Sequence, residues 1–191
     1  MGLRRSWHSR AMARQPRDDA PGIFHVTVRG VGPGPLYLDA FDPFFWHADF
    51  ATTLLRVPWT CMAVCLMTTH VHLLIDVPDS SLSAGMHRIN SVYARAFNRR
   101  HERSGPLQER RFHSTRIESD AHLDLAFRYI ARNPVEAHLC ISPLDWGWSS
   151  YRSAVGLEDG FTYLDISRVV GLYGRGPRAL ARLRTSVEAG G

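Results

Sequence analysis

The 191-residue sequence contains no lysine, and all 23 of its basic residues are arginine. The planar arginine side chain suits two-point contacts to phosphate and stacking on bases, although a chain without lysine can also reflect a GC-rich genome. The sequence also lacks a long apolar run: residues 59–67 are too few to cross a bilayer, and no apolar segment follows the arginines near the start. We therefore expect no membrane span, no signal peptide and a cytoplasmic protein of a prokaryote.

Cysteines are few, and the motifs of several enzyme classes are missing. Cys61, Cys65 and Cys140 are odd in number and do not have the spacing of a zinc knuckle, so we predict reduced, buried thiols. The sequence has no glycine-rich phosphate loop, no paired-carboxylate motif and no Gly-x-Ser-x-Gly elbow. These absences argue against conventional hydrolases.

The positive charge is concentrated in one segment. The whole chain carries a net charge of +5, whereas residues 88–116 alone hold eight arginines and two glutamates, a net charge of +6. This local excess indicates an anionic partner, with nucleic acid as the first candidate and a solvated basic face as the alternative. The arginines predicted to contact DNA are Arg88, Arg95, Arg99, Arg110, Arg111 and Arg116.

Hydrophobic periodicity predicts alternating strands and helices. The predicted strands are residues 24–29, 59–67, 70–77 and 111–117. One helix is expected between Asp42, as N-cap, and Pro58, with Phe44 and Leu55 among its apolar positions; a second carries Tyr93 on an apolar stripe. A third runs from Ser119-Asp120 to Asn133, where Pro134 disfavours further regular helix.

The predicted order is βαββαβ followed by a helix. This order is typical of the ferredoxin-like, split βαβ fold, an α+β antiparallel sheet with helices on one face and an open face for a site. Residues 1–19 are expected to be a flexible basic arm, residues 20–156 the main domain, and residues 157–191 a basic helical extension.

Two pairs of side chains could carry chemistry. His70 and His72 are two apart in a predicted strand, so both imidazoles project from the same face and can hold one divalent metal ion. Tyr129 and Asn133 lie one helical turn apart at the edge of an apolar stripe. The alternatives are ordinary surface histidines, a packing tyrosine and a helix-end asparagine.

The motifs, taken in order, resemble one family. They are His25-Val-Thr-Val-Arg-Gly30, Leu66-Met-Thr-Thr-His-Val-His-Leu-Leu74, Phe97-Asn-Arg-Arg100, Arg128-Tyr-Ile-Ala-Arg-Asn-Pro-Val135 and Asp145-Trp-Gly-Trp-Ser-Ser-Tyr-Arg152. Over residues 12–156 the sequence resembles the single-tyrosine HUH transposases of the insertion sequence two-hundred type, and within them the REP-associated tyrosine transposases. The resemblance places the metal ligands on His70, His72 and Asn133 and the nucleophile on Tyr129.

The resemblance implies a metal-dependent endonuclease and strand transferase that acts on single-stranded or hairpin DNA through a 5′-phosphotyrosine. The metal would be Mg²⁺ or Mn²⁺, and two imidazoles with one amide oxygen lean toward Mn²⁺. The protein would work without a nucleotide cofactor, as a monomer or a homodimer. Two alternatives stay open: a domesticated protein that binds hairpins without cutting them, and a metal-dependent nuclease in which Tyr129 is structural.

The sequence departs from the family pattern at three places. Thr68-Thr69 replaces the usual Pro-Asn before the histidines, a tryptophan is missing near residues 107–110, and Glu136 stands where a basic residue is common. Glu136 puts a negative charge near the DNA, so affinity or hairpin choice should differ. Tyr93 and Tyr151 are rival nucleophiles, and we expect both to be packing residues.

Overall fold

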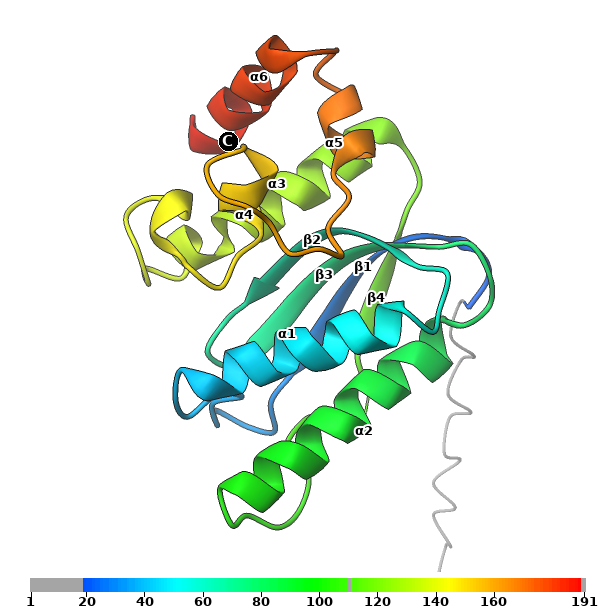
Figure 1. Cartoon of the computed structure of the whole chain (residues 1–191), viewed down its shortest axis with the longest axis vertical. Helices are drawn as coiled ribbons and strands as arrows, with labels where there is room; N and C mark the ends of the chain where they lie inside the picture. Colours follow the sequence, from blue (N-terminus) through cyan, green and yellow to red (C-terminus); the bar gives the residue numbers. More distant parts are fainter. Residues whose placement is uncertain (1–18, 110, 190–191) are drawn as a thin grey trace, which may run out of the picture.

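The period-two segments form one sheet in the computed structural model, which describes residues 19–109 and 111–189. All neighbouring strands are antiparallel, in the order β2-β3-β1-β4 (Figure 1). The strands are β1 (Gly22–Arg29), β2 (Thr60–Leu66), β3 (His70–Val77) and β4 (His113–Ile117). The predicted α+β, ferredoxin-like order is therefore confirmed.

Two helices cover one face of the sheet, as expected. They are α1 (Phe41–Leu54) and α2 (Leu82–Arg100). Val71, Leu73 and Ile75 of β3 point to this side, where they pack with Met86 and Ile89 of α2 in one buried cluster. Burial of these apolar side chains is the main force that holds the two layers together.

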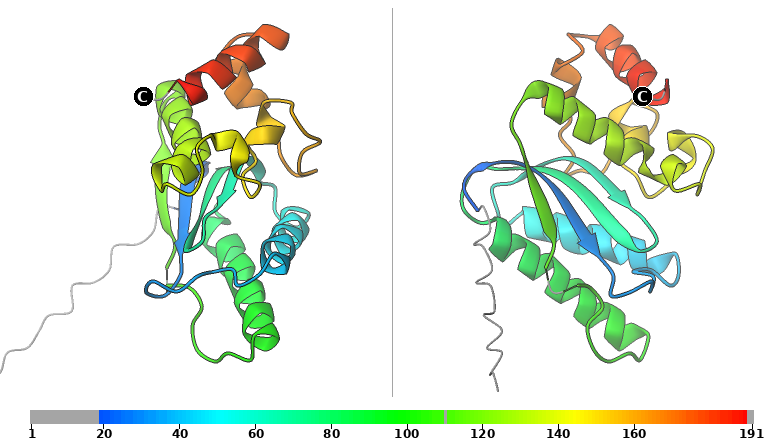
Figure 2. Two further views of the ribbon diagram at one scale, coloured as in Figure 1. Left: turned by 90° about the vertical axis from the view of Figure 1, so that its left-hand side faces the viewer. Right: turned by 180° about the vertical axis from the view of Figure 1, so that it is seen from behind.

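The opposite face is covered only in part. Helix α3 (Asp120–Glu136) crosses it over β2 and β3, so that α1 and α3 lie on opposite sides of the sheet (Figures 1 and 2). Leu123 and Phe127 of α3 pack there on Met62 and Leu74. The β4 side of this face stays open, because His113 and Thr115 are exposed. The predicted open face is thus confined to the β4 edge of the sheet.

The start and the buried side of α1 differ from the prediction. Asp42 lies inside the helix rather than at its N-cap; Asp39 instead accepts hydrogen bonds from the backbone N–H groups of Phe41 and Asp42, at 2.9 and 3.3 Å. Asp42 accepts from the N–H of Leu38 at 2.8 Å and pairs with Arg100 at 2.8 Å. An ion pair to a neighbouring helix competes successfully with local capping here.

The prediction of which side of α1 is buried is also wrong. Phe44 and Leu55 are 63% and 88% exposed, while Trp46 and Phe50, four residues apart, are buried against the sheet. Large aromatic rings bury more apolar area than the alanines that accompany Phe44 and Leu55, so they decide which side faces the core.

Helix α3 begins as predicted and ends later. Ser119 is the N-cap and accepts from the N–H of His122 at 3.1 Å. The helix continues through Pro134 to Glu136, because Pro134 removes only one donor and its own carbonyl still accepts from the N–H of Leu139 at 2.9 Å.

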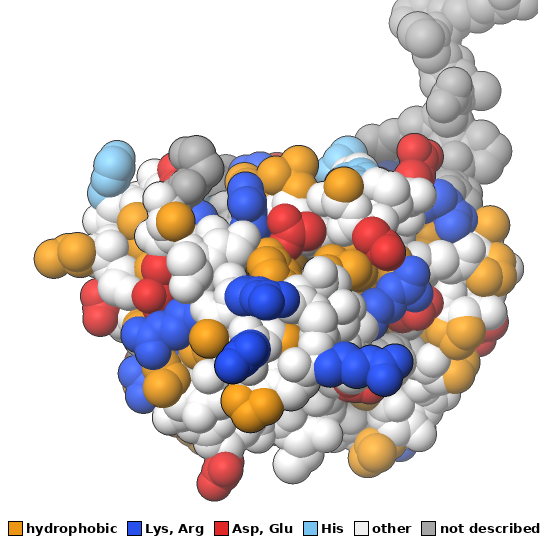
Figure 3. All heavy atoms as spheres, turned by 90° about the horizontal axis from the view of Figure 1, so that it is seen from above, with side chains coloured by type: hydrophobic (Ala, Val, Ile, Leu, Met, Phe, Trp, Pro, Cys, Tyr) orange, Lys and Arg blue, Asp and Glu red, His pale blue; other side chains and the backbone are white. Residues whose placement is uncertain are grey.

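The residues after α3 form short elements that complete the second core. They are the 3₁₀ turn η1 (Pro143–Asp145), α4 (Tyr151–Ala154), α5 (Ser167–Gly171) and α6 (Pro177–Glu188). Leu183 and Val187 of α6 join the cluster of Leu123 and Phe127. Seen from the α5–α6 end, arginine side chains are interspersed with acidic and hydrophobic ones (Figure 3).

The outer edge of β2 is protected by backbone from this C-terminal part. The N–H of Leu66 donates to the carbonyl of Trp148 at 3.0 Å, and the N–H of Asp165 donates to the carbonyl of Cys61 at 2.8 Å. Cys61 and Cys65 are free and buried, as predicted, and Cys140 is free but half-buried. Within residues 19–109 and 111–189, none of the helices has both the length and the apolar character that crossing a bilayer requires.

Candidate active site

Strand alternation brings His70 and His72 to the face crossed by α3. Val71, between them, points to the α1–α2 layer. Strand β1 pairs with β3 so that Thr27 lies opposite His72 and Arg29 opposite His70. The same alternation along β1 puts His25, Thr27 and Arg29 on the face that carries the two histidines.

Three donor atoms meet where β3 approaches α3. The Nε2 atom of His70 lies 3.3 Å from the Oδ1 atom of Asn133, and the rings of His70 and His72 are perpendicular with centroids 4.7 Å apart. Asn133 is buried, with 7% of its surface exposed. The Nε2 atom of His72 is buried and makes no hydrogen bond. Two imidazole nitrogens and one amide oxygen, one of them lacking a partner, fit a divalent metal ion.

A second layer of side chains orients His72. Its Nδ1 atom lies 2.9 Å from the Nε2 atom of His25 and 3.2 Å from the hydroxyl of Thr27. Because Nδ1 is held from β1, Nε2 faces His70 and Asn133, an arrangement common for metal-binding histidines. The sequence indicated neither side chain as a site residue, since only the strand register brings β1 beside His72.

Burial keeps the histidines of this cluster neutral. It lowers the pKa of His72 to about 2 and the pKa of His25 to about 4, in both cases with help from neighbouring histidines. Burial also lowers the pKa of His70, and the nearby Arg29 guanidinium adds to this effect. Neutral imidazoles leave their lone pairs free for a metal ion at neutral pH.

Tyr129 stands beside this cluster and faces solvent. Its ring is edge-on to His72, with centroids 5.5 Å apart, and it lies 5.7 Å from the ring of His25. The side chain is 49% exposed, one helical turn before Asn133. The structure therefore brings together all four residues that the sequence placed in one site.

The rival tyrosines are in the core. Tyr93 and Tyr151 are each 1% exposed. The hydroxyl of Tyr93 donates to the carbonyl of Leu36 at 2.6 Å, and the hydroxyl of Tyr151 contacts the carbonyl of Arg184 at 3.5 Å. Neither hydroxyl is open to a substrate in this conformation.

Four of the six predicted arginines lie away from Tyr129. Arg88, Arg95 and Arg99 lie on α2, in the layer on the other side of the sheet, and the first two lower the pKa of the nearby Asp49, although burial raises it overall to about 6. Arg116 donates to the carbonyls of Pro21 and Ala20 at 2.7 and 2.8 Å. Arg111 is exposed next to β4, and Arg110 lies outside the described residues.

A second group of side chains that could bind a metal ion lies where the start of α1 meets the end of α2. Asp39, Asp42 and His101 have side-chain atoms within 4.8 Å of one another. Arg100 already pairs with both carboxylates, at 2.6 Å to Asp39 and 2.8 Å to Asp42, and holds the pKa of Asp39 at about 2. This cluster is therefore an ion-pair network that links the start of α1 to the end of α2.

Known proteins are similar to this chain in both sequence and fold. The family model described as "Transposase IS200 like" matches residues 47–133, which include His70, His72, Tyr129 and Asn133. Over this segment the chain is similar in sequence to the IS200-like transposases. A Haemophilus influenzae protein named as a REP-associated tyrosine transposase is 26% identical over 148 residues, which cover 72% of this chain and 84% of that protein.

A solved structure has a similar fold. A REP-associated tyrosine transposase bound to a REP hairpin has a TM-score of 0.68 and 19% sequence identity, and the match covers 82% of this chain and 94% of that one. The predicted family resemblance and the predicted HUH-type α+β fold are both confirmed.

Proposed function

We propose that this protein cuts and rejoins single-stranded DNA beside hairpins, with Tyr129 as the nucleophile. The observation that carries the proposal is the meeting of His70 Nε2 and Asn133 Oδ1, 3.3 Å apart, with the unpartnered Nε2 of His72 and the exposed Tyr129. An ordinary packing role leaves no reason for a buried, unpaired nitrogen next to a half-exposed phenol.

His70, His72 and Asn133 would hold one divalent metal ion. When bound, the ion polarises the scissile phosphate and neutralises the charge that develops on its oxygens. The donor set of two imidazoles and one amide oxygen suits Mn²⁺ better than Mg²⁺, which prefers oxygen ligands. His25 and Thr27 keep His72 directed at this position through its Nδ1 atom.

Tyr129 supplies the reacting oxygen. Its hydroxyl oxygen attacks phosphorus, the new O–P bond joins Tyr129 to the 5′-phosphate end of the downstream fragment, and the bond from phosphorus to the 3′ oxygen of the upstream fragment breaks. The phenolic proton passes to the leaving 3′ oxygen, which becomes a 3′-OH group. Attack of a 3′-OH on the phosphotyrosine reverses the step, so rejoining needs no nucleotide cofactor.

Among the described residues, Arg29 is an arginine well placed for the substrate. It is exposed at the end of β1, opposite His70 in the sheet, and close enough to lower the pKa of both site histidines. A phosphate beside His70 would therefore meet the Arg29 guanidinium. The open β4 edge of the same face leaves room for the DNA strand that continues from that phosphate.

A covalent adduct tests the proposed function. The probe is a pool of 3′-labelled single-stranded oligonucleotides with one stem-loop and randomised flanks, incubated with the protein and Mn²⁺. We expect a labelled band on the protein that survives boiling in detergent. Cleavage without such a band would favour a nuclease in which Tyr129 is structural, and tight binding without either would favour a non-cleaving hairpin-binding protein.

Replacement of His25 by alanine should weaken metal binding without removing a ligand. Loss of the nearer of the two partners of His72 Nδ1 leaves only Thr27 to hold that ring, and losing such an outer partner typically costs about 10- to 100-fold in metal affinity. Calorimetric titration with Mn²⁺ measures the change. His113→Ala, an exposed histidine on the same face, is the matched control and should leave the affinity unchanged. An equal loss in both variants would contradict the orienting role.

The exposed arginines of α2 can be tested by salt dependence. If Arg95 and Arg99 each contact one phosphate of single-stranded DNA, Arg95→Gln/Arg99→Gln should reduce the slope of log affinity against log salt by about 1.4, since each contact is worth about 0.7. Fluorescence anisotropy over a salt series gives the slope. An unchanged slope would mean that the basic side of α2 is only solvated.

A further inference from the structure

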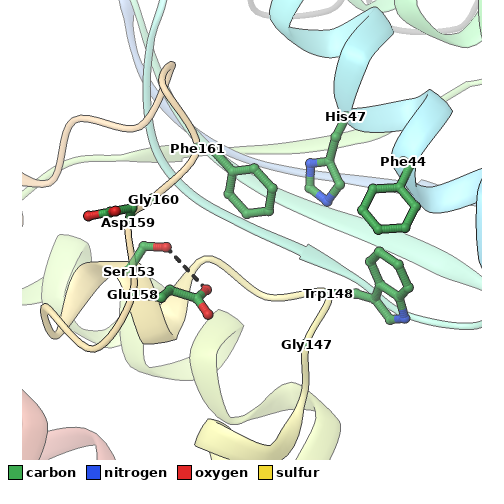
Figure 4. Close-up of a pocket in the computed structure, with 9 residues that line it drawn as sticks. All are labelled: Phe44, His47, Gly147, Trp148, Ser153, Glu158, Asp159, Gly160 and Phe161. Atoms are coloured by element: carbon green, nitrogen blue, oxygen red, sulfur yellow. Dashed lines mark hydrogen bonds between the residues drawn. The ribbon is translucent and has the colours of Figure 1, made fainter.

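We propose that the cavity between α1 and the loop after α4 binds one unpaired base of the DNA, with a preference for bases that carry an exocyclic amino group. The inference rests on the proposed function, because it assumes a single-stranded DNA substrate. The cavity has a volume of about 510 Å³ and lies beyond the β2 edge of the sheet (Figure 4). It contains none of the residues proposed for metal binding or nucleophilic attack.

Aromatic rings form two walls of this cavity. The ring of Phe161 is stacked on His47, with centroids 4.2 Å apart and planes within 16°, and Phe44 is edge-on to Trp148 at 5.2 Å. Phe44 comes from α1 and is 63% exposed, whereas Trp46 and Phe50 of the same helix are buried. Flat apolar walls of this kind suit a base, because every base has a stacking face.

His47 provides a polar group with no partner in the protein. His47 is buried, with 6% of its surface exposed. Its Nδ1 atom lies 2.6 Å from the hydroxyl of Tyr163, and its Nε2 atom is buried without a hydrogen bond. Figure 4 shows one ring nitrogen of His47 directed into the space between Phe161 and Trp148. A buried, unpaired nitrogen costs free energy that a ligand would recover.

The hydrogen bond to Tyr163 occupies Nδ1 of His47 and leaves Nε2 for a ligand. Burial raises the pKa of Tyr163 and lowers the pKa of His47 to about 4, so the phenol keeps its proton and the imidazole is neutral. When the Tyr163 hydroxyl donates to Nδ1, Nε2 carries the ring proton and donates to a ring nitrogen or carbonyl oxygen of a base. When Nδ1 donates to Tyr163, Nε2 accepts from the amino group of a base.

Acidic side chains on the opposite wall decide which part of DNA can enter. Glu158 and Asp159 line the cavity, and Glu158 also pairs with Arg152 at 2.7 Å and accepts from the Ser153 hydroxyl at 3.3 Å. Carboxylates repel a phosphate, but they accept hydrogen bonds from the amino groups of adenine, cytosine and guanine. Thymine has no such group, so it should bind most weakly.

One tryptophan links the cavity to the turn that precedes β3. Trp148 also lines a second hollow with Met67 and Thr68, immediately before His70. Its backbone is fixed there, since its carbonyl accepts from the N–H of Leu66 at 3.0 Å. A strand that passes the turn before His70 therefore meets Trp148 next, and Trp148 is a wall of the base cavity.

Binding of defined DNA probes tests this inference. The probes are one stem-loop with short unpaired tails on both sides, made entirely of dA, dC or dT, and binding is measured by anisotropy with Tyr129→Phe protein so that no cutting occurs. We expect the dA or dC tails to bind about 10-fold more tightly than dT, a typical effect of one well-held base. Phe44→Ala and Asp159→Asn should each reduce this ratio to less than about twofold.

The control and the outcomes separate this inference from the proposed function. Phe41→Ala removes a half-exposed ring from the same helix that does not line the cavity, and it should keep the preference. A preference that is absent, or that Phe44→Ala and Asp159→Asn leave intact, would overturn the base cavity. The covalent adduct of the unmodified protein is scored separately, so the strand-transfer proposal can stand while the cavity fails.

Discussion

Tyr129→Phe is expected to abolish the covalent protein–DNA adduct while leaving hairpin binding within about threefold. The substitution removes only one oxygen from a side chain that is 49% exposed, so the ring still packs beside His72 and His25. A phenol has a reference pKa near 10 and is a weak nucleophile at neutral pH. It therefore needs a phosphate that is already polarised and held in line, and no other described tyrosine lies beside the two histidines.

Two control variants test whether the loss of the adduct is specific to Tyr129. Tyr151→Phe removes a long contact of 3.5 Å to the Arg184 carbonyl and an interaction with Glu188, and Tyr93→Phe leaves the Leu36 carbonyl without its donor, which costs about 1–3 kcal/mol of stability. Both should keep the adduct, because both hydroxyls are buried in the core. An adduct that persists in Tyr129→Phe and disappears in either control would move the nucleophile to that residue. Loss of hairpin binding in Tyr129→Phe would make the role of Tyr129 structural.

Local periodicity was enough to assemble the candidate site within each element. The alternation of a strand fixes that His70 and His72 share a face, and the pitch of a helix fixes that Tyr129 and Asn133 share one. The contact between the two pairs, His70 Nε2 to Asn133 Oδ1, depends on how α3 crosses the sheet. Only the family resemblance, and not the spacing, joined the two pairs before the structure did.

Site residues whose position depends on strand register, or on which side of the sheet a helix packs, could not be predicted from local periodicity. His25 and Thr27 touch His72 because β1 pairs with β3, across 47 and 45 positions of sequence. The charge of residues 88–116 is real, but a count of charge does not say on which side of a sheet a helix packs. The structure puts α2 away from Tyr129 and leaves Arg29, outside that segment, next to His70.

A double substitution of the metal-binding histidines is expected to remove both metal binding and strand cleavage. The simple choice of two alanines is unsuitable, because His72 is 2% exposed rather than a surface residue, and alanine there would leave a void and an unpaired His25. His70→Ala/His72→Gln keeps a polar group beside His25. With two of three protein ligands changed, Mn²⁺ affinity should fall more than about 100-fold, and the adduct should disappear while hairpin binding persists.

Thermal unfolding gives a readout of this site that does not depend on activity. A ligand present at about 100 times its dissociation constant stabilises a protein by about 2.7 kcal/mol, and for a chain of this size each kcal/mol raises Tm by about 2–4 °C. Mn²⁺ should therefore raise the Tm of the unmodified protein by roughly 5–10 °C and leave His70→Ala/His72→Gln unchanged. His87→Ala/His113→Ala, which removes two exposed histidines, should keep the full shift. If the control loses the Mn²⁺ shift and the site variant keeps it, the metal ion is held elsewhere on the protein.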